Sequence, residues 1–427
     1  MLAKFIGTVG TRFLMAAITL IIMLSITQLL GAEIKGEISL LMLNITLIIM
    51  INNFVGGPSL VYLIPRMNLL QIVVPAYLWS VLAAGGMTFM LSALGQVSAP
   101  YIPVVFIISL IQSFTTVNMM VLLGKERIAT HNWLSLLQLF ILSVTLLASI
   151  VGFNMYTPEG YIIGLYISNT FAFLTSLVAI IPYLKPSGFS GTTKVLRELF
   201  HYGFLVQLGS TAQLLNYRLS YYLLEFFASN ESSGKILVGI YSTGVQLSES
   251  FWLITRSLSM VQYAHIANLK DEEASRQLTV ELLKFSFLTV LFMLIPALLI
   301  PEEWYTWIVG DEFAQVKSVM YYLAPGILSF SVSGILSHYF AGVGWHRINT
   351  YASLIGLFVT VALGTILIRE YQVAGAGITA SIAYVVITTY QMIVFIRKTG
   401  SSWKTLVPTK QDFSELMQRL SSFIKKD

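Results

Sequence analysis

The sequence predicts an all-α polytopic membrane protein, with twelve transmembrane helices in two six-helix lobes around a central cavity and a C-terminal amphipathic interfacial helix. Of its 427 residues, 56% are hydrophobic and only 11% are charged, and the mean hydropathy is +0.78. Soluble domains carry about a quarter charged residues. Twelve apolar runs are each long enough to cross a hydrocarbon core of about 30 Å, and a basic connection after the sixth run separates two equal halves.

The twelve apolar runs justify the predicted helices in order along the chain. Short polar or Gly/Pro-rich connections separate them, as expected between membrane spans. The runs are 5–30, 38–64, 73–94, 101–123, 132–153, 161–184, 200–227, 237–260, 278–300, 318–342, 347–368 and 373–396. The first is too long for a signal-peptide core, so we expect it to remain as the first span.

These runs also predict the organisation of the chain. We expect an N-terminal lobe over 1–184, a cytoplasmic linker over 185–199, a C-terminal lobe over 200–397 and a basic cytoplasmic tail over 398–427. In the tail, apolar residues from Phe413 to Ile424 recur at helical spacing and basic residues lie off that stripe. Such a helix is typical of segments that lie on a membrane surface. Binding of a partner protein is the alternative use of this tail.

The basic residues indicate how the chain crosses the membrane. Cytoplasmic loops near the ends of spans carry an excess of Lys and Arg. An N-terminus inside places most of the 25 basic residues in the cytoplasm. It leaves only Lys35, Lys235, Lys317 and Arg369 in outer loops. We therefore expect both termini in the cytoplasm.

A helix break is expected inside the second run. Asn52 and Asn53 precede Gly56, Gly57 and Pro58. Proline removes a backbone donor and glycine loosens a helix, so the helix kinks or unwinds here. Two interpretations remain open: a packing kink with small residues at a helix contact, or a polar cavity wall formed by the two asparagines.

Four charged residues within the spans are the candidates for function. Arg218 lies deep in the apolar stretch 204–227, Glu249 and Arg256 lie in the eighth run, and Arg12 lies in the first. Ionisable residues at such depth usually face a bundle interior or a watery cavity. Arginine suits phosphate because its planar fork donates two parallel hydrogen bonds. A carboxylate at mid-depth can instead titrate or bind sodium.

The same four residues have a structural interpretation. Arg12 and Arg256 can extend to the cytoplasmic headgroups. Arg218 can pair with Glu249 or with Glu225. Around Arg218, tyrosines and amides would give a cavity hydrogen-bonding and stacking surfaces suited to sugars, although aromatic residues are also common near membrane interfaces. These residues are Tyr217, Tyr221, Tyr222, Gln207, Gln213, Asn216 and Gln246.

Several functional classes lack their signatures. The chain has no cysteine, and its five histidines lack metal-ligand spacing, so we expect no metal site. Walker, Rossmann, nucleophile-elbow and kinase motifs do not occur, which argues against an ATP-driven pump or an enzyme. We expect no cofactor and no nucleic-acid partner.

Several stretches resemble a known family. They are GTVGTRF in the first span, TQLLGAEIKGEISLL, NFVGGPSLVYLIPR, LVGIYSTGVQLSESFW, WIVGDEF and GAGITASIAYVVITTY. Together they resemble the polysaccharide (O-antigen and exopolysaccharide) flippases of the multidrug/oligosaccharidyl-lipid/polysaccharide (MOP) transporter superfamily. The resemblance covers nearly the whole chain.

This resemblance implies a function. Two lobes would alternate between inward and outward openings and move an undecaprenyl-pyrophosphate-linked oligosaccharide across the inner membrane of a bacterium. Arg12 stands where such proteins have a first-span arginine. Together with Arg218 and Arg256, which the apolar runs single out, it would hold the pyrophosphate at successive depths. Glu249 would couple transport to protons or sodium, and Asn52, Asn53, Tyr217 and Gln246 would line the cavity. Membrane lipids, a polysaccharide polymerase and glycosyltransferases are the implied partners.

Three alternatives remain open. A multidrug or other small-molecule exporter is one, although the first half has no acid within a span where a cation would bind. A lipid II flippase of the same superfamily is another; such proteins usually have fourteen spans and further first-lobe arginines. An integral-membrane glycan polymerase or ligase is the third, but the longest outer connection, around Pro301 to Lys317, is short for a catalytic loop.

Overall fold

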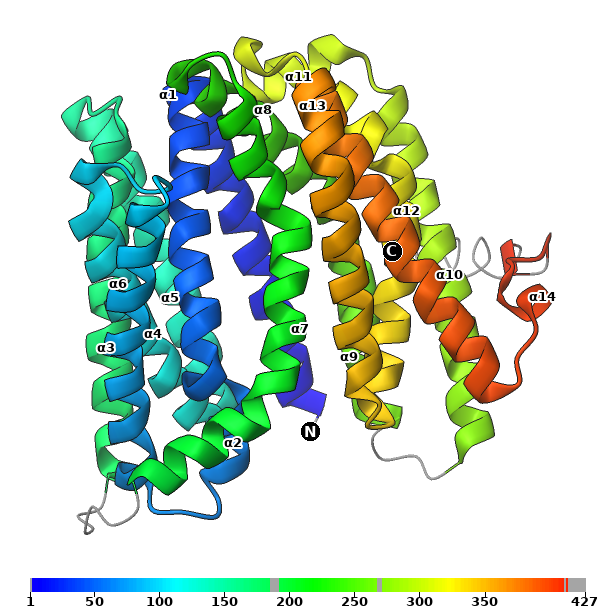
Figure 1. Cartoon of the computed structure of the whole chain (residues 1–427), viewed down its shortest axis with the longest axis horizontal. Coiled ribbons are helices and arrows are strands. Elements are labelled where there is room, and N and C mark those ends of the chain that lie inside the picture. The colour runs from blue at the N-terminus through cyan, green and yellow to red at the C-terminus, as the bar shows by residue number, and fades with distance from the viewer. Residues whose placement is uncertain (1, 185–191, 267–270, 411, 414–427) are drawn as a thin grey trace. The chain divides into compact units, whose positions relative to one another are not determined.

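The computed structural model describes residues 2–184, 192–266, 271–410 and 412–413, and this part of the chain contains helices and no strand (Figure 1). The main helices are α1 (Leu2–Gly56), α2 (Pro58–Leu63), α3 (Leu69–Ala93), α4 (Ile102–Gly124), α5 (Ile128–Leu147), α6 (Pro158–Ile180), α7 (Thr192–Phe227), α8 (Glu231–Ser250), α9 (Trp252–Ile266), α10 (Glu272–Leu299), α11 (Glu302–Val309), α12 (Val316–Gly342), α13 (His346–Thr399) and α14 (Trp403–Leu406). Short 3₁₀ or π turns are η1 (Ala99–Tyr101), η2 (Ala148–Gly152), η3 (Ile181–Tyr183) and η4 (Asp311–Phe313). The predicted all-α fold class is confirmed.

The described helices are roughly consistent with the twelve predicted crossings. Within the described residues, eight helices are long and apolar enough to cross a membrane, and two of these, Gly10–Leu63 and His346–Thr399, each have 54 residues. Both contain a break, at Gly31 (φ 82°) and at Gln372 (φ 46°), so each supplies two crossings. The predicted spans 200–227 and 237–260 fall on α7 and on the α8–α9 pair. The chain is a multi-pass membrane protein.

The chain divides into two compact units. Unit 1 comprises Met1–Thr211, Glu231–Gly239 and Ile308–Gly310, and unit 2 comprises Ala212–Asn230, Ile240–Trp307 and Asp311–Asp427. Helices α7 and α8 therefore each begin in unit 1 and end in unit 2. Part of the predicted linker, 185–191, lies outside the described residues, and α7 already begins at Thr192 within the remainder.

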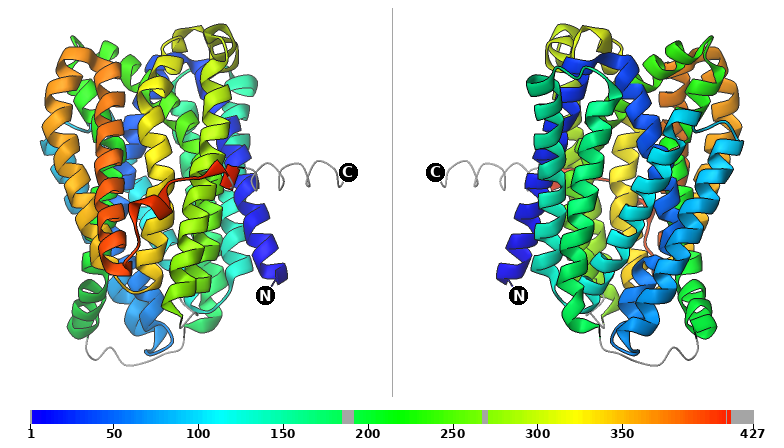
Figure 2. Two further views of the ribbon diagram at one scale, coloured as in Figure 1. Left: turned by 90° about the vertical axis from the view of Figure 1, so that its right-hand side faces the viewer. Right: turned by 90° about the vertical axis from the view of Figure 1, so that its left-hand side faces the viewer.

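Unit 1 is a bundle in which α1 and α3 to α6 run side by side (Figures 1 and 2). Its core includes Leu60, Ile72, Val117, Ile180 and Leu199, each no more than 1% exposed. Apolar residues meet there from α2, α3, α4, α6 and α7, and burying their surface from water or lipid lets the helices pack at interior density.

The helix break predicted in the second span is present. Helix α1 ends at Gly56, Gly57 has non-helical backbone angles (φ −102°, ψ −147°), and α2 starts with Pro58 at its first position. Proline is tolerated there because the first N–H groups of a helix have no intrahelical partner.

Two glycines in unit 1 allow α1 and the start of α8 to touch backbone to backbone. A Cβ added at Gly36 would stand 1.7 Å from the Lys235 carbonyl oxygen, and one at Gly239 would stand 2.0 Å from that of Ala32. Small residues at a helix contact, here Ala32 and Gly36 on α1 and Gly239 on α8, allow such close crossings in membranes. Beside this crossing, Lys235 forms ion pairs with Glu231 (2.9 Å) and Glu37 (3.4 Å).

Unit 2 contains α9, α10, α12, α13 and the C-terminal halves of α7 and α8. Asp271 caps α10, since its side chain accepts hydrogen bonds from the backbone N–H groups of Glu273 and Ala274. The core includes Leu283, Ile335, Phe340 and Phe395.

Residues 400–410 and 412–413, which we call the strap, lie along α10 within unit 2 (red in Figure 2, left). The strap contacts that helix at several points along its length. Arg276 donates to Ser401 (3.3 Å), Leu406 is buried in the core beside Leu283, and the Lys284 ammonium lies 3.1 Å from Asp412. The ring of Phe413 then packs 5.2 Å from that of Phe292.

The contacts of the strap therefore run along α10 from Arg276 to Phe292. These residues are sixteen positions apart, which is about 24 Å at ~1.5 Å per helical residue. The predicted amphipathic tail begins at its end. Most of that tail, residues 411 and 414–427, lies outside the described residues.

Candidate functional site

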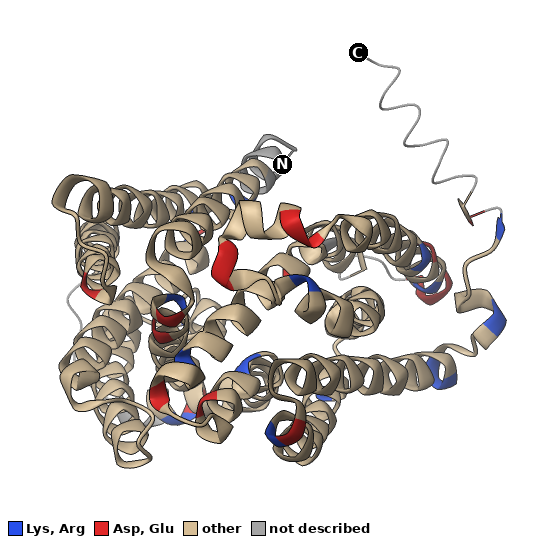
Figure 3. Ribbon diagram, turned by 90° about the horizontal axis from the view of Figure 1, so that it is seen from above, with Lys and Arg blue, Asp and Glu red and all other residues tan. Residues whose placement is uncertain are grey.

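Arg218 and Glu249 form the central pair of unit 2. The guanidinium of Arg218 on α7 donates two parallel hydrogen bonds to the carboxylate of Glu249 on α8, Nη1 to Oε1 at 2.8 Å and Nη2 to Oε2 at 2.9 Å. The two side chains are 24% and 15% exposed. Charges are sparse along the helices (Figure 3). A bidentate pair of this kind is the geometry in which arginine holds a carboxylate most strongly.

Aromatic rings surround the arginine. The guanidinium carbon lies 5.5 Å from the centre of the Tyr221 ring and 6.0 Å from that of Tyr217. Tyr217 in turn contacts Trp252, Phe330 and Tyr384, with ring centres 5.7 to 6.0 Å apart. Ring faces attract a cation and exclude water, so the pair lies in a partly dry, polarisable environment.

Sequence reasoning missed part of this aromatic cluster. Trp252, Phe330 and Tyr384 come from α9, α12 and α13, and the indole N–H of Trp252 donates to the carbonyl of Ile327 (3.0 Å). The only sequence signal is that Trp252 follows Glu249 by three residues and precedes Arg256 by four, which puts all three near one helical face.

Amide side chains on α7 bind α13. Asn216 donates to the Ser353 carbonyl (2.9 Å) and accepts from the Thr360 hydroxyl (3.3 Å). Gln213 accepts from the Ser353 hydroxyl (2.9 Å). Gly356 leaves the space for this contact, since a Cβ there would stand 3.0 Å from the Asn216 amide nitrogen. These amides thus hold the helix that carries Arg218 in place.

The remaining candidates of unit 2 flank the pair. Arg256 is exposed, and its guanidinium carbon lies 6.0 Å from the Trp252 ring centre. Gln246 is half-buried one turn before Glu249. The structure thus brings Arg218, Glu249 and Tyr217 into contact, and Trp252 connects Arg256 to them.

Three candidates belong to unit 1. Arg12 is exposed on α1. Asn52 is fully buried and accepts a hydrogen bond from the Ser80 hydroxyl (2.8 Å), while Asn53 beside it is half-buried. The placement of Asn52 between α1 and α3 favours the packing interpretation for that residue. The expected ladder of Arg12, Arg256 and Arg218 spans both units and stays a prediction.

The pair can perform two kinds of chemistry. Its guanidinium can bind a phosphate with the same two parallel bonds that it now gives to a carboxylate. Its carboxylate offers two acceptor oxygens, which a bound cation could occupy in place of the arginine. Among the residues that the structure describes, no cluster of three or more histidines and acids could hold a metal ion.

Comparison with known proteins identifies the fold. No family model matches the chain. Lipid II flippase MurJ from Bacillus subtilis (strain 168) is 23% identical over 257 residues, which are 54% of this chain and 44% of that protein, so the match spans less than half of the relative.

Solved structures resemble nearly the whole chain. One of lipid II flippase MurJ in an inward closed conformation has a TM-score of 0.73 at 14% identity, covering 97% of this chain and 90% of that one. The chain thus has the fold of this flippase. An inward-facing multidrug resistance MATE transporter of the MOP superfamily has a TM-score of 0.71 at 13% identity, covering 90% and 94%. The predicted fold is thus supported, whereas membership of that superfamily and of its polysaccharide-flippase branch stays a prediction.

Proposed function

We propose that this protein is a flippase that moves an undecaprenyl-pyrophosphate-linked oligosaccharide from the cytoplasmic to the outer leaflet for surface polysaccharide biosynthesis. Transport would proceed by alternating access of two six-helix lobes and would be driven by an ion gradient. The observation that carries this proposal is the bidentate Arg218–Glu249 pair inside a membrane bundle. The shared fold with a lipid flippase supports it.

The pair suggests how an anion is bound and released. Glu249 acts as a resident anion that occupies the arginine fork when no substrate is bound. A pyrophosphate offers the same fork-shaped arrangement of oxygens with more charge, so it competes for Arg218. Uptake of a proton or sodium ion by Glu249 neutralises the competitor and frees Arg218 for the substrate. Loss of that ion restores the pair and expels the pyrophosphate.

Other residues have secondary roles in this proposal. Arg12 and Arg256, both exposed, would receive the pyrophosphate before or after Arg218. Tyr217 and Gln246 would face the sugars, because aromatic and amide groups stack on and hydrogen-bond to glycans. Asn52 and Asn53 would act through the helix break that follows them.

The test is transport by purified protein in liposomes. A labelled undecaprenyl-pyrophosphate oligosaccharide is placed in one leaflet, and its arrival in the other is measured with and without a proton or sodium gradient. Arg218→Gln and Glu249→Gln are expected to abolish gradient-driven transport. Arg369→Gln and Glu370→Gln, exposed neighbours on α13 in the same unit, are the matched controls and should transport normally. Normal transport by both site variants would refute the assignment.

Two other substrates have a specific observation in their favour. The sequence match to MurJ favours lipid II. The aromatic cluster around Tyr217, Trp252 and Phe330, next to the acid Glu249, favours a lipophilic cation, as does the similarity to a multidrug transporter. The same liposomes distinguish these cases when lipid II or a fluorescent organic cation replaces the oligosaccharide. The proposal requires faster transport of the oligosaccharide lipid than of either competitor.

A further inference from the structure

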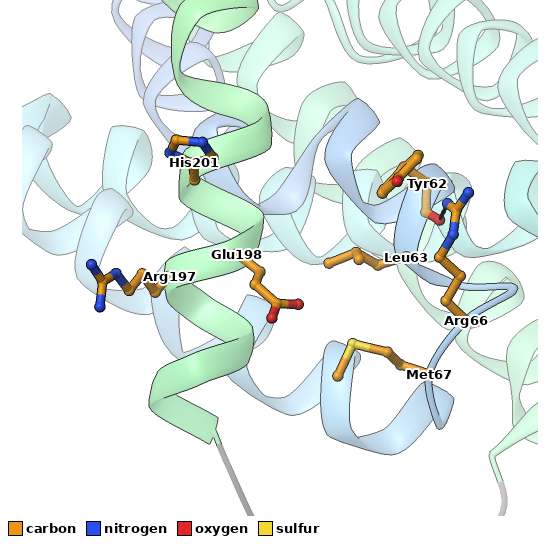
Figure 4. A pocket seen from close by; sticks show the side chains of 7 residues that line it. All are labelled: Tyr62, Leu63, Arg66, Met67, Arg197, Glu198 and His201. Carbon is orange, nitrogen blue, oxygen red and sulfur yellow. Dashed lines mark hydrogen bonds between the residues drawn. The ribbon is translucent and has the colours of Figure 1, made fainter.

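A pocket lies in unit 1 where α2 meets the start of α7 (Figure 4). It has a volume of about 620 Å³ and is lined by Tyr62, Leu63, Arg66, Met67, Arg197, Glu198 and His201. That volume is in the range of small-molecule sites. The pocket belongs to unit 1 alone, so it is separate from the Arg218–Glu249 pair, and its ligand is independent of the proposed function.

One wall of the pocket presents an oriented cation. The Arg66 guanidinium carbon lies 3.6 Å from the centre of the Tyr62 ring, and its Nη1 donates to the Tyr62 carbonyl. These two contacts fix the plane of the guanidinium. Arginine has five N–H donors, so most of them remain available to an anion. A phosphate is the group that such a fork binds best.

The opposite wall presents a carboxylate. Glu198 is half-buried, and its side chain turns from α7 toward the wall formed by Leu63 and Met67 (Figure 4). Among the side chains that the structure describes, none makes a hydrogen bond or an ion pair with it. The guanidinium of Arg197 extends to the other side of α7 in the same view. A purely anionic ligand would be repelled by Glu198, whereas a ligand that also carries an ammonium would be attracted.

Apolar and aromatic surface adjoins the charged groups. Leu63 and Met67 line the pocket itself. Next to it on α7, Phe200 stacks on Phe54 with ring centres 5.6 Å apart, and Phe204 packs 5.4 Å from Phe200. Phe200 is 39% exposed and Phe204 43% exposed. This aromatic surface suits the acyl chains of a lipid.

The pocket lies at the basic end of unit 1. The end of α2, the α4–α5 turn and the start of α7 carry Arg66, Lys125, Arg127 and Arg197. Arg127 donates to the Tyr183 hydroxyl (2.7 Å), which joins the start of α5 to the end of α6 at this level. The excess of basic residues predicts that this end faces the cytoplasm, at the depth of the lipid headgroups.

We propose that this pocket binds the headgroup of a zwitterionic phospholipid, with the phosphate on Arg66 and the ammonium on Glu198. The acyl chains lie over Phe200 and Phe204. Neither group alone selects this lipid: Arg66 recognises any phosphate, and Glu198 discriminates against headgroups without a positive charge.

The experiment measures lipid binding to the full-length protein in detergent by native mass spectrometry. The probes are phosphatidylethanolamine, phosphatidylglycerol and soluble glycerophosphoethanolamine. The variants are Arg66→Gln and Glu198→Gln, with Lys125→Gln and Glu126→Gln from the neighbouring α4–α5 turn as matched controls. Elution as a single species and an unchanged Tm establish that each variant is folded.

The wild-type protein should bind phosphatidylethanolamine more tightly than phosphatidylglycerol. Arg66→Gln should weaken both lipids by about tenfold, the loss expected for one charge-assisted contact. Glu198→Gln should weaken phosphatidylethanolamine alone and so remove the preference. Control variants should bind as the wild type does.

Three results would overturn the proposal. Tighter binding of phosphatidylglycerol, strengthened further by Glu198→Gln, would make this an anionic-lipid site. Equal affinity for glycerophosphoethanolamine would exclude a role for the acyl chains. Unchanged binding in both variants would place the lipid elsewhere.

Discussion

The Arg218–Glu249 pair yields a prediction that can be measured without knowing the substrate. Replacing Glu249 with glutamine leaves the Arg218 guanidinium without its counter-ion in an aromatic, partly dry environment. Replacing both residues with glutamine removes both charges. A double-mutant cycle of the two single variants and the double variant therefore isolates the interaction between the two charges.

The structure sets the magnitude. Two hydrogen bonds of 2.8 and 2.9 Å place the charge centres about 4 Å apart, which at an effective dielectric constant of about 20 corresponds to roughly 4 kcal/mol. Exposures of 24% and 15% let water screen part of this attraction. We expect a coupling free energy of about 2 to 3 kcal/mol, below the roughly 3 to 5 kcal/mol lost when a fully buried pair is broken.

The assay is chemical unfolding of the four proteins in detergent, followed by tryptophan fluorescence. Trp252 lies in the cluster next to the pair and reports its environment. Each single variant should lose about 2 to 4 kcal/mol of unfolding free energy, and the double variant should lose less than the sum of the two. Strictly additive losses would refute the reasoning, because they would mean that the two charges do not interact.

Two further predictions concern the scaffold. Gly239→Ala should lower the free energy of unfolding by about 1 to 3 kcal/mol, because its Cβ would stand 2.0 Å from the Ala32 carbonyl oxygen and force α1 and α8 apart. Gly86→Ala in α3 is the control: a Cβ there meets nothing within 4 Å, so this variant should be neutral or stabilising in the same unfolding experiment. Partial burial of Asp412 opposes its ionisation, but hydrogen bonds from Thr409 and Lys284 lower the pKa of its carboxyl below the usual value. The ion pair with Lys284 is therefore fully present above the ordinary carboxyl pKa and is lost as pH falls through the lower folded pKa. Limited proteolysis should find the wild-type strap protected at neutral pH and released only in strong acid, whereas Asp412→Asn should be cleaved at every pH; equal cleavage of both proteins at neutral pH would contradict this.

The sequence predicts the helices of this fold well because hydropathy reports where a chain enters lipid. It predicts their ends poorly. The connection between the first two runs, residues 31–37, is helical except for a break at Gly31, and α13 continues through residues 369–372 with a break at Gln372. Glu and Lys are good helix formers in water, so the helix persists where the apolar run stops. The break at Gly57 was predictable because proline and glycine change the backbone itself.

The candidate site was predictable in part for a related reason. A charge in an apolar run stands out, so Arg218 and Glu249 could be found, and pairing between them was one of two interpretations. The aromatic residues around the pair could not be found in this way. Phe330 and Tyr384 lie in apolar runs in which an aromatic residue facing lipid looks the same as one facing the core. Which face of α12 or α13 points inward depends on tertiary packing, here on contacts such as Gly356 against Ile387 and Asn216.

The structural and functional interpretations of the Arg218–Glu249 pair predict different transport by one variant, in which both residues are glutamine. If Arg218 and Glu249 only neutralise each other, the double glutamine variant recovers both stability and transport, because no buried charge remains. If Arg218 binds the substrate phosphate and Glu249 competes with it, the double variant regains stability but not transport. A carboxylate already held in the arginine fork is thus compatible with function, because an anion site inside a membrane needs a counter-ion whenever its substrate is absent. The comparison of stability with transport in the same protein separates the two roles.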